Sequence, residues 1–108
     1  MNFDNFTIKA QQAVQQAVDR AQQNGQQAIT PVHLLAGVLA VGENATKFVL
    51  GKLGVNEQAL QAAVNQELQH QPRVSGNSSS PYLADTANKV LLRAQDLARK
   101  GGDTYVGL

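Results

Sequence analysis

The chain has 108 residues, its formal net charge is +1, and 16% of its residues are charged. This length supports one domain with a modest core, and the charge lacks the basic excess of a nucleic-acid-binding protein. No cysteine is present, which excludes disulfides and thiolate metal sites. The opening residues carry Asp4 and Lys9 and no apolar run, so no signal peptide is expected. The longest apolar stretch, around Leu34–Val41, is too short to cross a membrane. We expect a cytoplasmic protein with neither nucleic-acid nor membrane partners.

The first predicted helix extends from about Thr7 to Asn24. Thr7 is the expected N-cap, because its hydroxyl can accept a hydrogen bond from a first-turn N–H. Asn24-Gly25 is the expected left-handed stop. Apolar residues recur at steps of three and four, which places them on one face of the helix. They are Phe6, Ala10, Ala13, Val14, Ala17, Val18 and Ala21.

Three more predicted helices lie between residues 30 and 69. Thr30-Pro31 is a strong start signal, because proline at the first helical position loses no hydrogen bond. The helix that follows, through Val41, is apolar almost all round and is expected in the middle of the core. Asn44–Leu53 and Asn56–Gln69 are predicted as the third and fourth helices, with Asn56 as an N-cap.

Residues 70–81 break the helical pattern. Proline, glycine, asparagine and serine dominate this stretch, which predicts a solvated linker containing His70. A fifth helix is predicted from about Asp85 to Lys100, and Gly101-Gly102 ends it. No β-branched run alternates with polar residues, so no strands are expected.

The chain contains an internal repeat with a shift of 77 residues. The shift preserves the apolar or turn role of each matched residue, including the helix-ending glycine and the apolar residue after it. The matched pairs are Phe6 and Leu83, Ala10 and Ala87, Ala13 and Val90, Val14 and Leu91, Ala17 and Ala94, Ala21 and Ala98, Gly25 and Gly102, and Ile29 and Val106. The sequence therefore predicts two copies of one helical unit.

The second copy stops where its buried helix should begin. We expect an all-α helical bundle of two pseudo-symmetric repeats with the second one truncated: repeat one at about 6–69, the linker at 70–81 and the start of repeat two at 82–108. Part of the apolar stripe on the last helix is then uncovered. Burying one Leu or Val is worth about 1.5–3 kcal/mol, so we expect this chain to be marginally stable, self-associating or part of a longer ordered protein.

Two motifs resemble the Clp amino-terminal repeat. The first comprises Phe6-Thr7-x-Lys9-Ala10-Gln11 and Ile29-x-Pro31-x-His33-Leu34-Leu35, and the second extends from Tyr82-Leu83 to Asp103-x-Tyr105-Val106. The start of the chain and Pro81-Tyr82-Leu83 are more similar to ClpB disaggregases than to the protease-coupled ClpC and ClpA unfoldases. The Tyr105-Val106-Gly107 segment is also similar to ClpC.

This resemblance implies a mobile domain on a homohexameric AAA+ ATPase. Such a domain engages unfolded or aggregated polypeptide, or an adaptor protein, and passes it to the pore. ATP and Mg²⁺ would bind AAA+ modules outside these residues, so no cofactor and no enzymatic activity are expected here. The alternatives are a ClpC- or ClpA-like adaptor-docking domain and a free-standing helical adaptor.

The same resemblance places a substrate-binding groove at the junction of the two repeats. Thr7, Leu97 and Asp103 match positions that the family uses for substrate contact, and Arg93 stands where an apolar residue is expected. Each also has a structural interpretation: Thr7 as an N-cap, Leu97 as a core residue and Asp103 as a turn residue. An apolar groove with polar edges would accept the apolar side chains that unfolded chains expose.

The sequence offers no convincing catalytic, nucleotide-binding or metal site. Gly51-Lys52 is followed by Leu53, whereas a P-loop requires Ser or Thr there. The two histidines are far apart in sequence, and His33 on an apolar helix is interpreted as a satisfied core histidine rather than a base or ligand.

Overall fold

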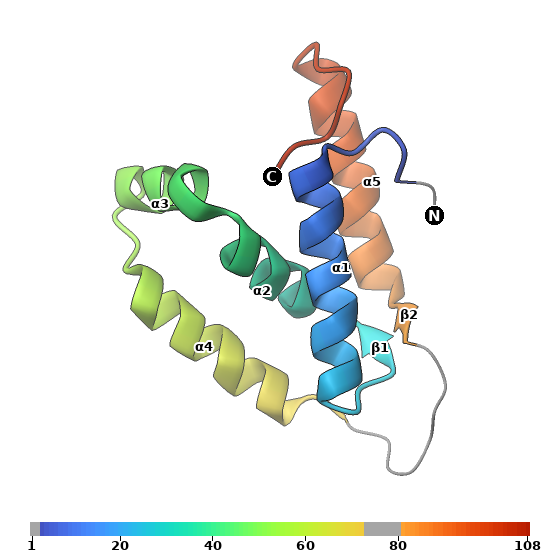
Figure 1. Cartoon of the computed structure of the whole chain (residues 1–108), viewed down its shortest axis with the longest axis vertical. Coiled ribbons are helices and arrows are strands. Elements are labelled where there is room, and N and C mark those ends of the chain that lie inside the picture. Colours follow the sequence, from blue (N-terminus) through green and yellow to red (C-terminus); the bar gives the residue numbers. More distant parts are fainter. Residues whose placement is uncertain (1–2, 73–80) are drawn as a thin grey trace.

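The computed structural model describes residues 3–72 and 81–108 and is mostly helical, as predicted (Figure 1). The elements, in chain order, are α1 (Ile8–Gln23), β1 (Ala28–Ile29), α2 (Pro31–Val41), α3 (Glu43–Lys52), α4 (Glu57–His70), β2 (Tyr82–Leu83) and α5 (Asp85–Lys100). Most of the predicted linker lies outside the described residues. His70 is the last residue of α4 rather than part of the linker, because the helical hydrogen bonding continues one residue beyond the predicted end.

Local sequence signals account for several helix ends. The hydroxyl of Thr7 accepts a hydrogen bond from the Ala10 N–H at 3.1 Å, which confirms Thr7 as the N-cap of α1. Asn56 caps α4 in the same way through Ala59 at 3.0 Å. Gly25 has a φ of 67°, the left-handed conformation expected after α1.

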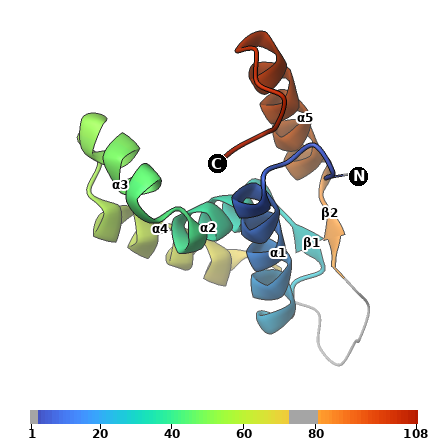
Figure 2. The same ribbon diagram turned by 45° about the horizontal axis from the view of Figure 1, so that its top comes forward.

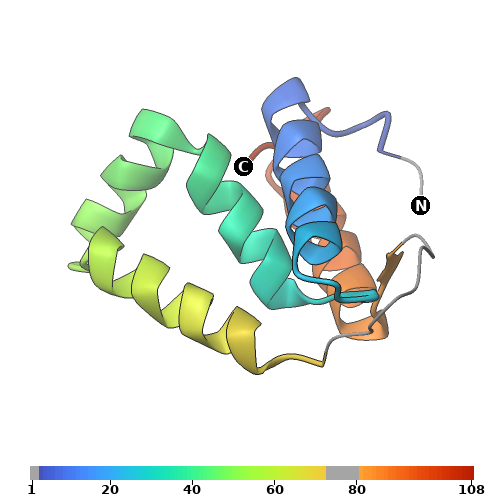
Figure 3. The ribbon, with the colours of Figure 1, turned by 60° about the horizontal axis from the view of Figure 1, so that its bottom comes forward.

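Helix α2 lies between α1 and α4, and α3 closes the end of that layer (Figure 3). The contact between α1 and α2 is close, because a Cβ placed on Gly37 would lie 2.0 Å from the carbonyl oxygen of Ala13. The expectation that α2 is buried all round is wrong. His33, Leu34 and Gly37 are buried, but Leu35 is 39% exposed, since the described helices cover only part of the α2 surface.

Short parallel pairings join the two halves of the chain, contrary to the expectation of no strands. Strand β1 pairs with β2, with Ile29 opposite Leu83, and an isolated parallel bridge joins Phe6 to Val106. Each paired stretch is too short to give the alternating pattern by which strands are recognised. The two pairings are equivalent, because a shift of 77 residues converts Phe6 into Leu83 and Ile29 into Val106.

Backbone hydrogen bonds follow the same symmetry. The Thr7 N–H donates to the Val106 carbonyl at 2.8 Å, and the Ala84 N–H donates to the Ile29 carbonyl at 2.9 Å. The turns after α1 and α5 are likewise equivalent, and Gly102 has a φ of 80°. These matches confirm the pseudo-symmetric repeat.

The core forms around the junction of the two repeats. Its buried members are Phe6, Ala10, Ala17, Ala21, Ile29, Leu34, Ala87, Leu91 and Val106. Helix α5 runs beside α1, and its C-terminal half extends away from the other helices (Figures 1 and 2). Ala13 is 4% exposed because α2 covers it, whereas the matched Val90 is 45% exposed. The predicted uncovered stripe on α5 is therefore present in the described structure.

No single helix among residues 3–72 and 81–108 is long and apolar enough to cross a membrane. The pair Pro31–Val41 and Asn44–Lys52 reaches that length and composition together, but with a bend of 112°.

Candidate functional site

An apolar groove lies where α1, α2 and α5 meet. Its volume is about 150 Å³, which is close to that of a cavity that holds one benzene molecule. Most of its lining is apolar, and Val90 and Leu108 leave much of their surface exposed at its margin. The lining residues are Phe6, Ala10, Ala13, Val14, Leu34, Val38, Val90, Leu91, Ala94, Val106, Gly107 and Leu108.

Leu97 and Arg93 lie on α5 next to this groove but do not line it. Leu97 is three residues after the lining residue Ala94, and Arg93 is three after Val90, which places each on a neighbouring turn of the same side. Leu97 is 54% exposed, so its interpretation as a core residue is wrong: no described helix packs over that part of α5. Arg93 is exposed and pairs with Asp96 at 3.6 Å.

Thr7 and Asp103 lie close to the segment that contains Val106. Thr7 bonds to the Val106 carbonyl through its backbone, and Asp103 lines a hollow of about 320 Å³ together with Val106 and Asn5. The Asp103 N–H donates to the Ala98 carbonyl at 2.9 Å, so Asp103 is a turn residue with an exposed side chain. The start of α1 and the end of α5 thus bring these two predicted residues into one region.

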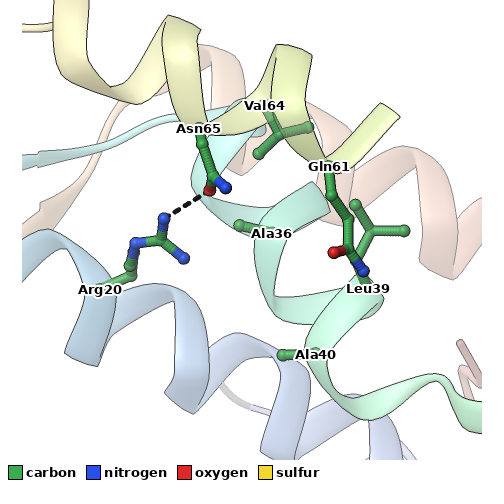
Figure 4. Close-up of a pocket in the computed structure, with 7 residues that line it drawn as sticks. All are labelled: Arg20, Ala36, Leu39, Ala40, Gln61, Val64 and Asn65. Carbon is green, nitrogen blue, oxygen red and sulfur yellow. Dashed lines mark hydrogen bonds between the residues drawn. The ribbon is translucent and has the colours of Figure 1, made fainter. Parts of the chain in front are cut away.

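A second hollow lies between α1, α2 and α4, and the sequence analysis did not predict it (Figure 4). Its volume is about 230 Å³, and a guanidinium N–H of Arg20 donates to Oδ1 of Asn65 at 2.6 Å across it. The remaining lining residues are Ala36, Leu39, Ala40, Gln61 and Val64. The sequence did not single out Arg20, because the adjacent Asp19 balances its charge. No local pattern connects Arg20 with Asn65, which lies 45 positions later.

His33 is a buried structural residue, as interpreted from the sequence. It is fully inaccessible, and its Nδ1 accepts a hydrogen bond from the Thr30 N–H at 3.0 Å. Burial, and then the positive charge of Arg20, lower the pKa of His33 from its usual 6.5. No group of three or more potential metal ligands occurs in the part of the chain that the structure describes.

A sequence model of the Clp repeat (R) N-terminal domain matches residues 5–108. The chain belongs to this family of chaperone N-terminal domains. It is 48% identical over 108 residues to the chaperone protein ClpB of Bacteroides thetaiotaomicron, and 44% identical over 108 residues to that of Porphyromonas gingivalis. Both matches cover 100% of the chain but only 12% of each relative, so the chain corresponds to a small part of these proteins.

Solved N-terminal domains share the fold. The Hsp104 N-terminal domain from Candida albicans has a TM-score of 0.85 and 21% identity, with 96% of this chain and 68% of that chain covered. The ClpV1 N-terminal domain from Escherichia coli has a TM-score of 0.86 and 24% identity, with coverage of 96% and 63%. A ClpV N-domain in complex with a VipB peptide has a TM-score of 0.77 and 14% identity, with coverage of 96% and 62%.

Proposed function

We propose that this chain binds unfolded or aggregated polypeptide as the N-terminal module of a ClpB-like chaperone. The supporting observation is the groove between α1, α2 and α5, with exposed apolar side chains beside it. An apolar groove accepts the apolar side chains of unfolded polypeptides with little sequence selectivity, because burial of apolar surface is non-directional. Arg93 adds a positive charge near this surface and would favour clients with acidic residues beside their apolar ones.

The four predicted residues have distinct roles in this proposal. Leu97 extends the apolar surface along α5, and Arg93 forms a charged edge. Asp103 supplies a carboxylate at the turn after α5, where it would accept hydrogen bonds from the backbone of a bound chain. Thr7 keeps its capping role and holds the segment before α1 against Val106.

Disaggregation itself would require the remainder of a ClpB-like protein. In this proposal, a cytoplasmic homohexamer of AAA+ modules binds ATP and Mg²⁺, and the present domain delivers clients to it. In this proposal, residues 5–108, which match the Clp repeat domain, perform the client-binding step only.

Docking of an adaptor protein is the second candidate function. It is favoured by one observation, the peptide bound to a ClpV N-domain of the same fold. A groove that receives one defined peptide would show sequence selectivity, whereas the leading proposal predicts similar affinities for unrelated unfolded chains.

Replacement of Leu97 tests the leading proposal. We expect Leu97→Ser to weaken binding of a reduced, unfolded model protein several-fold, because one exposed apolar contact is lost. Leu92→Ser is the matched control, since Leu92 is 50% exposed on the same helix but lies five residues from Leu97, on a different side. Fluorescence anisotropy of the labelled client measures both affinities. Equal affinities of the folded wild-type chain and Leu97→Ser would remove this surface from the proposal.

A further inference from the structure

The hollow between α1, α2 and α4 contains a half-buried arginine whose side-chain partner among the described residues is a neutral amide. Arg20 donates to Oδ1 of Asn65 at 2.6 Å, and no carboxylate of the described residues forms an ion pair with it. A guanidinium has five N–H donors in a planar fork, so most of its donors remain for a ligand. Figure 4 shows the side chains of Arg20 and Asn65, both of which line the hollow, pointing toward one another.

The remaining walls combine apolar and amide groups. Leu39 and the buried Val64 form apolar walls, and the small side chains of Ala36 and Ala40 leave the space open on the α2 side. Gln61 adds a second amide to the lining (Figure 4). Such a site suits a group with an anionic end, which Arg20 and the amides would bind, and a short apolar body.

The nearest acidic side chain on the same helix does not fill this role. Asp19 lines an adjoining hollow of about 120 Å³ that shares Arg20, Ala36 and Ala40. Its Oδ1 instead accepts a hydrogen bond from Nε2 of Gln15 at 3.0 Å. The positive charge of Arg20 is therefore available on the side that faces α4.

We infer that the hollow between α1, α2 and α4 binds a carboxylate of a polypeptide segment whose adjacent residue is apolar. A planar carboxylate matches the arginine fork, and Leu39 and Val64 contact the neighbouring apolar side chain. The exposed Gln61 and Asn65 leave the hollow open to an extended chain. This site is separate from the groove at α5, and it differs from that groove in having a charged side chain, Arg20, among its lining residues.

The test uses the ¹⁵N-labelled 108-residue chain and three N-acetylated tetrapeptides. Acetyl-Leu-Leu-Glu-Leu-amide carries a side-chain carboxylate, its Gln counterpart carries none, and acetyl-Leu-Leu-Gln-Leu with a free C-terminus carries an α-carboxylate. We expect saturable NMR shifts at Arg20 and Asn65 with at least one carboxylate peptide and none with the uncharged one. The two carboxylate peptides distinguish an acidic side chain from a chain end.

Three variants assign the binding to the hollow. Arg20→Gln should weaken binding about 10- to 100-fold, because a charge-assisted hydrogen bond is lost. Lys89→Gln removes one exposed positive charge from α5 and should leave the affinity unchanged. Ala40→Leu fills the space from the exposed side of α2, keeps Arg20 and Asn65, and should also weaken binding. Ala40→Leu keeps the test valid if Arg20→Gln fails to fold.

His33 provides an independent readout. The charge of Arg20 contributes to the lowered pKa of His33, so a carboxylate bound to Arg20 should move the His33 titration to higher pH. Equal binding of the Glu and Gln amides, or full affinity in a folded Arg20→Gln or Ala40→Leu variant, would overturn the inference. Failure here leaves the proposed function intact if Leu97→Ser still weakens binding of the unfolded protein, so the two outcomes are distinguishable.

Discussion

Nε2 of His33 lies 2.7 Å from Oε1 of Gln26 in the interior of the domain. Because Nδ1 of His33 accepts from the Thr30 N–H, the proton of the neutral ring must be on Nε2, which donates to Gln26. Gln26 in turn donates from its own Nε2 to the Leu68 carbonyl at 2.6 Å. One neutral imidazole thus links the turn after α1, the start of α2 and the end of α4.

This linkage predicts that stability falls in mild acid. The pKa of His33 is below 6.5 in the folded chain, so the unfolded chain binds the proton more readily. The contribution of His33 to the free energy of unfolding is therefore complete above pH 6.5, and it is lost as the pH falls towards the folded-state pKa. Urea unfolding between pH 7.5 and 5 measures this loss of stability. NMR titration that places His33 at or above 6.5 would contradict the prediction.

The contact between α1 and α2 predicts opposite effects of alanine at two glycines. Gly37→Ala should destabilise the chain by about 1–3 kcal/mol, because the new Cβ would meet the Ala13 carbonyl at 2.0 Å and push the helices apart. Gly51→Ala is the control, since nothing lies within 4 Å of its Cβ, and it should stabilise α3 by about 0.5–1 kcal/mol. Urea unfolding compares both variants with the wild-type chain. Equal stability of the two variants would show that the close contact is absent.

Capping and client binding by Thr7 are separable. Thr7→Ala should cost about 0.5–2 kcal/mol because the Ala10 N–H loses its acceptor. Thr7→Asp should retain the cap and the melting temperature. If Thr7 also contacts clients, anisotropy measurements will show weaker binding for both variants, whereas a pure capping role changes stability only in Thr7→Ala. An unchanged melting temperature in Thr7→Ala would contradict the cap.

Alanine substitutions at two adjacent apolar residues of α5 should have different effects on the free energy of unfolding. Leu91→Ala should cost about 2–5 kcal/mol, because Leu91 is buried in the shared core. Val90→Ala should change the unfolding free energy by no more than about 0.5 kcal/mol, since its side chain is largely exposed. Urea unfolding checks the pair, and similar losses would mean that Val90 is covered in solution.

Exposed apolar side chains also predict self-association of the 108-residue chain. Sedimentation velocity at rising concentration should show species larger than a monomer, because Val90, Leu97 and Leu108 remain accessible. Leu97→Ser should reduce the association. A single monomeric species at every concentration would refute this expectation.

Much of the fold could be predicted because its signals are local or repeated. The residues of α5 match the predicted range, and Thr7 and Asn56 act as the caps that their side chains indicate. The pairing of Phe6 with Val106 could not be predicted by itself, because two-residue pairings between distant segments leave no periodic pattern. The 77-residue shift matched Phe6 with Leu83 and Ile29 with Val106, but it did not predict that Phe6 pairs with Val106.

The site was less predictable than the fold. Resemblance placed Thr7 and Asp103 in one region, but it could not give the exposure of Leu97, which depends on which helices cover α5. The contact between Arg20 and Asn65 depends on tertiary packing of α1 against α4 across a 45-residue separation. A contact between two single side chains on different helices leaves no repeated pattern in the sequence from which it could be predicted.

The bridge between Phe6 and Val106 also sets an order of events during synthesis. Ribosomes add about 5–20 residues per second, and domains begin to fold as their residues emerge. Helices α1 and α2 are neighbours in sequence and can associate early, but Val106, the backbone partner of Thr7, is made only after all of α1 to α5. A nascent chain therefore keeps its leading segment unanchored until translation reaches Val106, which gives cotranslational chaperones and proteases a defined interval of access.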